Sequence, residues 1–261
     1  MDKHYADTVR LLLNIAPEVF DNDVFAMKGG TAINLFLRDM PRLSVDIDVV
    51  YRPWQTPRDQ ALQTIHQELA AIAQRVERLG VQTRLIRSKD FEDTKLIAEN
   101  ESSQVKVEVN VVFRGTVLPV ERHPLGSRTS DRFGVEFEVP ILAPDELYAS
   151  KLVAALDRQH PRDLFDVWQL FQTGGLTDAM IECFVVYLAG HNRPTHEVLF
   201  GNDKDIASEY ARTFVGMTEV ACPLETLLDT RARLRHELPR RLHAAHRQFL
   251  RGMVRAEPDW S

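Results

Sequence analysis

Residues Lys28 to Val50 read KGGTAINLFLRDMPRLSVDIDVV, and this stretch indicates the fold of the first half of the chain. A glycine pair and a threonine precede an apolar run. Two aspartates, one residue apart, then follow in a segment that otherwise resembles a buried strand. An unpaired buried carboxylate costs several kcal/mol, so aspartates in such a strand require a compensating group.

The first part of the stretch is typical of a turn that opens a helix. Gly29 and Gly30 interrupt the chain, and Thr31 stands where an N-cap belongs, ahead of AINLFLR. Such a turn presents backbone N–H groups and the positive end of a helix, which together bind phosphate. The alternative is an ordinary capped turn that binds nothing.

The second part predicts a strand, VDIDVVY, which is rich in β-branched residues. Residues i and i+2 of a strand share a face, so Asp46 and Asp48 project together. Their carboxylates repel each other unless a cation lies between them, and hard oxygen ligands suit Mg²⁺, with Mn²⁺ as a substitute. The alternative is a pair of solvated aspartates at a strand end.

Further groups that pair with phosphate flank these two features. Lys28 precedes the glycines, and Arg42 and Ser44 precede the aspartates. We therefore expect an anion site and a cation site on neighbouring elements.

A third carboxylate lies in QVKVEVNVVF. The valines of this run share one face, and Lys106, Glu108 and Asn110 share the other. If this strand lies beside VDIDVV, Glu108 could complete a two-metal arrangement that activates a hydroxyl and stabilises a leaving pyrophosphate. A polar face turned toward water is the alternative.

The periodicity changes along the chain. Helices are expected at 5–15 and 57–79, and strands at VQTRLIRS, TKLIAEN and GVEFEVP. From Leu142 onward every periodic segment is helical. The sequence therefore predicts an α+β fold, with an N-terminal mixed sheet and flanking helices over residues 1–140 and a helical domain over 141–261.

The helical half contributes KLVAALDRQHPRDLFDVWQL. Asp163 and Asp166, at i and i+3, share a face of one helix, and Lys151 lies on the helix before it. Such a lysine could bind a triphosphate or a base, while an aspartate orients the bound group or positions a proton. Salt bridges between two helices are the alternative.

Composition indicates the class of protein and the compartment in which it is expected. The 261 residues are 44% hydrophobic, carry a net charge of −6 and include two cysteines, which favours free buried thiols in a reducing cytoplasm. Neither a membrane span nor a signal peptide is expected. The stretch Arg231 to Arg255 holds eight arginines and one acid, Glu237, and is either a polyanion-binding surface or a solvated helix face.

Taken together, KGGTAINLFLRDMPRLSVDIDVV and KLVAALDRQHPRDLFDVWQL resemble the AbiEii/AbiGii-type nucleotidyltransferase toxins, which include the MenT-type toxins and belong to the DNA polymerase β-like superfamily. The resemblance implies a nucleotidyltransferase-type sheet and a helical domain that completes the active site. It implies a triphosphate turn at Gly30 and Thr31, a Mg²⁺-binding pair at Asp46 and Asp48, and catalytic roles for Lys151 and either Asp163 or Asp166.

The resemblance also implies a function. We expect a cytoplasmic toxin, controlled by a cognate antitoxin, that transfers a nucleoside monophosphate from an NTP to RNA. Relatives of known activity add pyrimidine nucleotides to the 3′ end of tRNA. The alternatives are transfer to a protein or small-molecule hydroxyl, a non-catalytic nucleotide- or RNA-binding module and, with less support, a glycosyltransferase that uses the DxD motif.

Overall fold

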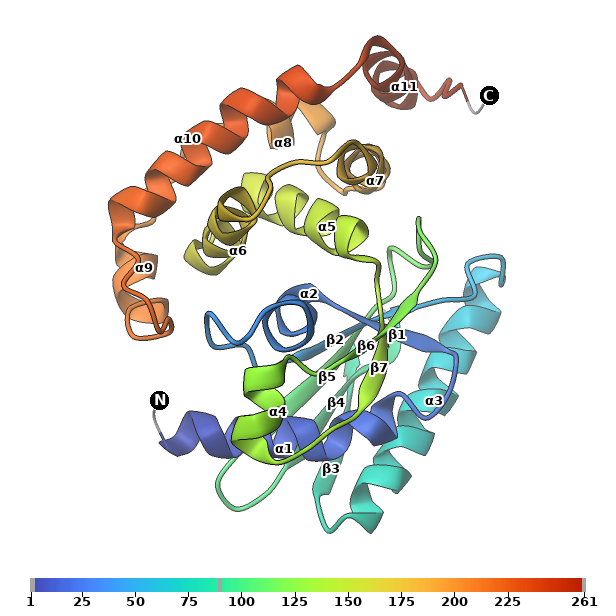
Figure 1. Ribbon diagram of the computed structural model, residues 1–261. Coiled ribbons are helices and arrows are strands. Elements are labelled where there is room, and N and C mark those ends of the chain that lie inside the picture. The colour runs from blue at the N-terminus through green and yellow to red at the C-terminus, as the bar shows by residue number, and fades with distance from the viewer. Residues whose placement is uncertain (1–2, 89–90, 260–261) are drawn as a thin grey trace. The chain divides into compact units, whose positions relative to one another are not determined.

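The computed structural model describes residues 3–88 and 91–259, and the chain divides into two compact units, Met1–Ala143 and Pro144–Ser261. Figure 1 shows strands and helices in the first unit and helices in the second. The sequence predicted a first domain over residues 1–140 and a change to helical periodicity at Leu142.

A seven-stranded mixed sheet forms the centre of the first unit, in the order β3-β4-β5-β2-β1-β7-β6. The pairs β1–β7 and β2–β5 are parallel, and the other neighbours are antiparallel. The α+β fold with a mixed sheet is thus confirmed. The strands are β1 (Phe25–Lys28), β2 (Ile47–Tyr51), β3 (Gln82–Ser88), β4 (Phe91–Glu99), β5 (Gln104–Asn110), β6 (Glu121–Pro124) and β7 (Glu138–Ile141).

The alternation read from QVKVEVN is confirmed in β5. Val105, Val107 and Val109 are buried, whereas Lys106 and Glu108 are half-buried on the other face. Two helices, α1 (Lys3–Val19) and α3 (Arg58–Arg78), contact each other and the sheet, and they lie side by side in Figure 1. Apolar burial against these helices accounts for the valine face, which leaves the opposite face of β5 for polar side chains.

Three elements of this unit were not predicted. The central strand β1 has the short sequence FAMK, which shows no alternation because three of its four residues are fully buried. The edge strand β6 and the short helix α4 (Ser127–Phe133) carry charged and polar residues in place of an apolar period. Tertiary pairing rather than local pattern forms these elements.

The second unit is built from helices, as the helical period from Leu142 onward predicted. They are α5 (Pro144–Asp157), α6 (Pro161–Gln172), α7 (Asp178–Ala189), α8 (Thr195–Phe200), α9 (Ala207–Thr213), α10 (Leu224–Arg241) and α11 (Ala244–Val254), of which α8 was not predicted. Helix α5 contacts α6, α7, α8 and α10 and is buried on most sides. Among the described helices, none combines the length and the apolar character that a membrane crossing requires.

Candidate functional site

The glycine turn follows β1 directly and begins a helix earlier than expected. The first helical turn, α2, spans Gly29–Thr31, and the π-helical segment η1 continues over Ala32–Leu37. Thr31 therefore lies inside the helix, with φ −68° and ψ −41°, and the prediction that it is the N-cap is wrong. The π turn is closed by a 2.9 Å bond from the Arg38 N–H to the Ile33 carbonyl. Such turns occur often at functional sites.

The Thr31 side chain instead joins the turn to the segment before β2. Its hydroxyl donates a hydrogen bond to the Asp46 carbonyl oxygen and lies 3.0 Å from the Ser44 hydroxyl. These partners are distant in sequence, so the bonds fix the glycine turn against the residues that precede the strand. The turn and the two aspartates therefore form one local assembly.

Side chains from β2 and from the segment before it lie against both glycines. A Cβ at Gly29 would come within 2.5 Å of an Asp48 carboxylate oxygen, and Gly29 also has a positive φ of 77°. A Cβ at Gly30 would meet the Arg42 guanidinium at 2.6 Å and the Ser44 hydroxyl at 2.9 Å. The structure thus brings together the predicted residues Gly29, Gly30, Thr31, Arg42, Ser44, Asp46 and Asp48.

The sheet register aligns charged residues in a row beside this turn. Lys28 of β1 pairs with Asp48 of β2, Asp48 pairs with Glu108 of β5, and Glu108 pairs with Lys95 of β4. Cross-strand partners lie on the same face of a sheet. The row therefore reads lysine, aspartate, glutamate, lysine across four strands, so the two acids are neighbours with a lysine on either side.

Glu108 is held by two lysines. Its carboxylate oxygens lie 2.9 Å from the Lys95 ammonium and 2.8 Å from the Lys106 ammonium. Burial raises the pKa of Glu108, but hydrogen bonds from Lys106 and Lys95 outweigh burial and leave the pKa below its usual range. The bond to Glu108 raises the pKa of Lys106, and the charges of Asp46 and Asp48 raise it further. Lys106 is thus an additional cation near the aspartate pair, which the sequence analysis did not assign to the site.

The donor set at this site fits a divalent cation that shares its ligands with a substrate. Asp46 and Asp48 supply hard oxygen atoms beside a turn that suits phosphate, and Mg²⁺ is typically held by one or two carboxylates and substrate phosphates. Within residues 3–88 and 91–259, no group of three His, Cys, Asp or Glu side chains is placed to hold a metal ion. Asp48 lies within β2, whereas Asp46 directly precedes that strand, and Glu108 lies one strand away with its lysines.

Tyr5 also positions the site, and the sequence gave no local signal for it. The Ser44 N–H donates a 3.0 Å hydrogen bond to the Tyr5 phenol oxygen from α1. Burial raises the pKa of Tyr5 to about 12, so the phenol stays neutral. Arg42, which is 2% exposed, donates a 2.8 Å bond to the Leu43 carbonyl. Both side chains fix the loop that carries Ser44 and leads into the aspartates.

The second unit contains its own buried ionic cluster. The Lys151 ammonium of α5 lies 2.9 Å from Asp163 and 3.1 Å from Asp166 of α6, and the side chains of all three are at most 7% exposed. The Arg158 guanidinium lies 2.9 Å from the second oxygen of Asp163. The predicted shared face of Asp163 and Asp166 is confirmed. A buried lysine between two carboxylates holds both in place, because neither is stable there unpaired.

Most arginines of the Arg231–Arg255 stretch form hydrogen bonds, ion pairs or ring contacts with other residues of the second unit. Arg231 donates bonds of 3.0 Å to Gln159 and 2.7 Å to the Lys204 carbonyl. Arg241 donates to the Leu176 carbonyl at 3.0 Å. Several others do likewise: Arg233 with Phe171 and Glu237, Arg235 with Gly201 and Asp203, Arg240 with His236, and Arg247 with Pro239 and Leu242. The stretch is therefore not a uniform basic surface.

Comparison with known proteins gives a match over nearly the whole chain. Residues 10–261 match the family described as nucleotidyl transferase AbiEii toxin of type IV toxin–antitoxin systems. The fold is similar to that of MenT4, a nucleotidyltransferase toxin from Mycobacterium tuberculosis H37Rv, with a TM-score of 0.69 and 17% sequence identity. That alignment covers 97% of this chain and 90% of MenT4. No curated protein matches the chain by sequence.

Proposed function

Because the chain belongs to the nucleotidyl transferase AbiEii toxin family of type IV toxin–antitoxin systems, we propose that it transfers a nucleoside monophosphate from an NTP to tRNA. The acceptor is the 3′ hydroxyl, the preferred donor is a pyrimidine NTP, and the product besides the modified RNA is pyrophosphate. A cognate antitoxin controls this reaction in the cytoplasm.

The observation that carries the proposal is the convergence of the glycine turn on the aspartate pair. The Asp48 carboxylate lies against Gly29, and the Thr31 hydroxyl bonds to the Asp46 carbonyl. A triphosphate bound at the turn would thus have the Asp48 carboxylate beside it. Lys28, Arg42 and Ser44 complete the surroundings of the phosphates, because a triphosphate requires positive charge and hydrogen-bond donors.

The residues of the first unit hold the reactants in this account. Asp46 and Asp48 bind the cation, and backbone N–H groups of the turn bind phosphate oxygens. The chemistry that a bound Mg²⁺ supplies is neutralisation of phosphate charge and activation of the attacking hydroxyl. The acceptor oxygen forms a bond to the α-phosphorus, the bond from that phosphorus to the pyrophosphate oxygen breaks, and the hydroxyl proton passes to a carboxylate or to solvent.

Lys151, Asp163 and Asp166 are proposed as catalytic residues on the strength of the resemblance. Their geometry supports a role for the lysine that depends on both aspartates, since each carboxylate contacts the same ammonium group. Loss of either aspartate is expected to alter the position of Lys151. Glu108 is a weaker candidate for a metal ligand, because two lysines already bind its oxygens.

Incubation of the purified protein with each labelled NTP, total tRNA and Mg²⁺ tests the proposal. Asp46→Asn and Asp48→Asn are expected to abolish labelling while the melting temperature stays near that of the parent. Asp59→Asn, an exposed aspartate in the first turn of α3, is the matched control and should label normally. Label that the Asp48 variant still incorporates would refute the assignment of Asp48. Label found on protein or on a small molecule would show that the acceptor is that molecule and not tRNA.

A further inference from the structure

A groove in the second unit lies outside the ionic cluster formed by Lys151 and the two aspartates. It has a volume of about 510 Å³ and is bordered by α8, the C-terminal end of α10, and α11. Its lining is mainly apolar, with Leu199, Leu242 and Leu250 buried at its base. The volume is in the range of sites that bind ligands or partner side chains.

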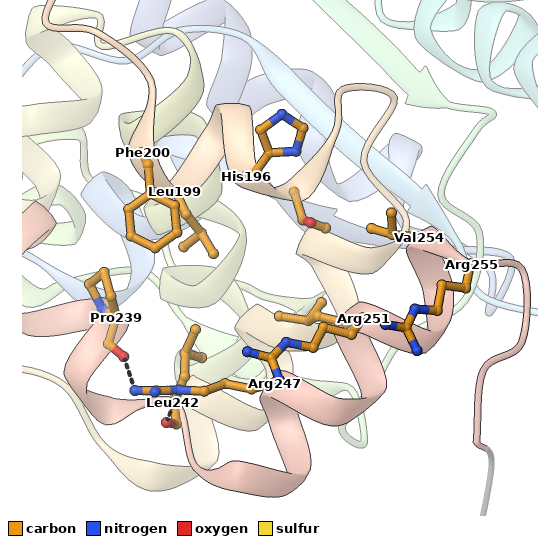
Figure 2. A pocket seen from close by; sticks show the side chains of 11 residues that line it. His196, Leu199, Phe200, Pro239, Leu242, Arg247, Arg251, Val254 and Arg255 are labelled. Atoms are coloured by element: carbon orange, nitrogen blue, oxygen red, sulfur yellow. Dashed lines mark hydrogen bonds between the residues drawn. The ribbon is translucent and has the colours of Figure 1, made fainter.

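Two large apolar side chains at this groove are unusually exposed. Phe200 is 68% exposed and Val254 is 66% exposed. Figure 2 shows Phe200 and Leu199 of α8 across the groove from the arginines of α11, with Val254 toward the Arg255 end. Exposed apolar groups that border an apolar groove are a feature of binding surfaces, because water contact with them is unfavourable.

A row of arginines forms the other side of the groove. Arg247 and Arg251 of α11 and its C-cap residue Arg255 are spaced four residues apart, so they lie along one side of the helix over roughly 12 Å. Arg247 donates to the Leu242 and Pro239 carbonyls, as the dashed lines in Figure 2 show. Within the described part of the chain, Arg251 and Arg255 have no acidic partner, unlike Arg233 or Arg241, which pair with acids.

This combination of surfaces distinguishes between two kinds of partner. A long polyanion such as RNA requires an extended basic surface, but most arginines of α10 bind within the unit. In the described part of the chain, the two arginines of the Arg231–Arg255 stretch without an acid or carbonyl partner, Arg251 and Arg255, lie in a short row beside an apolar base. A ligand that matches must therefore carry a few negative charges along one side of an apolar stripe.

We propose that this groove binds an acidic amphipathic helix of a partner protein. The apolar stripe of that helix would pack on Leu199, Phe200 and Val254. Carboxylates one turn apart would face Arg251 and Arg255, whose spacing on α11 is also about one turn. The arrangement follows the general mode in which a helix occupies an apolar groove, with charge complementarity at the rim fixing its orientation.

Selection from a displayed library of random peptides of about 14 residues, four helical turns, tests the proposal on the full-length protein. Peptides retained by the parent protein and not by the double variant Arg251→Glu, Arg255→Glu are synthesised with a fluorophore, and their affinities are measured by anisotropy. We expect acidic sequences whose apolar residues recur with a helical period. The charge-reversed variant should bind them about tenfold more weakly or worse.

Matched variants separate the contributions of charge and apolar surface. Phe200→Ser should also weaken binding of the selected peptides, because its side chain supplies part of the apolar wall. The controls are Arg240→Glu and Val220→Ser, an exposed arginine and an exposed valine outside the groove lining, which should leave affinity unchanged. Failure to enrich acidic amphipathic peptides would overturn the proposal. Arg251 and Arg255 variants that lose affinity for a single-stranded RNA, while Phe200→Ser retains it and no peptide is selected, would show a polyanion site instead.

Discussion

Replacement of Gly29 by alanine should separate the backbone cost of the turn from its role in the site. Gly29 has φ +77°, and Gly80 has the same φ of +77°. An L-residue in this conformation costs about 1–2 kcal/mol. Gly80→Ala has nothing within 4 Å of the new Cβ, so its effect should be limited to this strain. A loss of about 1 kcal/mol lowers the melting temperature by about 3 °C in a unit of this size.

The new methyl group at Gly29 has a second consequence. It would lie 2.5 Å from an Asp48 oxygen, whereas ordinary contacts begin at 3.4 Å, so the carboxylate must retreat by close to 1 Å. A misplacement of about 1 Å in a catalytic site can reduce the rate by about 100-fold. Gly29→Ala should therefore lose activity far beyond its loss of stability.

Thermal unfolding and nucleotidyl transfer to tRNA, measured on both variants, provide the assay. We expect similar changes in melting temperature and a transfer rate that falls only for Gly29→Ala. Equal transfer rates in the two variants would refute the reasoning, because the position of the Asp48 carboxylate would then not matter.

Three further predictions follow from the ion pairs and hydrogen bonds. Lys151→Met should lower the free energy of unfolding by about 3–5 kcal/mol in urea denaturation, because it removes the buried cation that two buried carboxylates share, and Asp163 then keeps only the more exposed Arg158. Replacing both Asp163 and Asp166 by asparagine should restore part of this loss, and no recovery would contradict the account. The lowered pKa of Glu108 means that its pairing stabilises the fold above the ordinary carboxyl value of 4.5 and loses this effect as pH falls through the lowered value. The stability difference between the parent and Glu108→Gln should therefore shrink in acid, and a difference that grew would refute the pairing. Tyr187→Phe removes a 3.0 Å hydrogen bond to the fully buried Glu146 and should cost about 1–3 kcal/mol in the same urea assay, whereas an unchanged midpoint would show that the bond is unimportant.

The parts of the fold that bury one face were predictable from periodicity. Helix α6 begins and ends where the pattern PRDLFDVWQLFQ does, and β5 alternates as QVKVEVN does. Strand β1 was missed because a short central strand buried on both faces has no period to detect. The arginines of α10 resembled a surface charge cluster, since sequence cannot distinguish a guanidinium that binds loop carbonyls from one that faces water.

The composition of the candidate site was predictable, but its local geometry was not. The residues around Gly29 and Asp48 were identified because acids and glycines are costly in apolar elements without a ligand. The start of the helix at Gly29 and the bond from Thr31 to the Asp46 carbonyl depend on tertiary contacts with the segment before β2. Tyr5 was missed for the same reason, because it reaches the site from α1, and Lys106 was placed only on the polar face that it shares with Glu108.

Binding of a non-hydrolysable NTP analogue, measured by calorimetry with Mg²⁺ and with EDTA, tests whether the turn and the aspartates bind one metal–nucleotide complex. The parent protein should bind the analogue more tightly in Mg²⁺ than in EDTA. Asp48→Asn should bind it equally in both conditions, at the affinity that the parent has in EDTA. An Asp48→Asn protein that retains the full gain in affinity from Mg²⁺ would contradict the account.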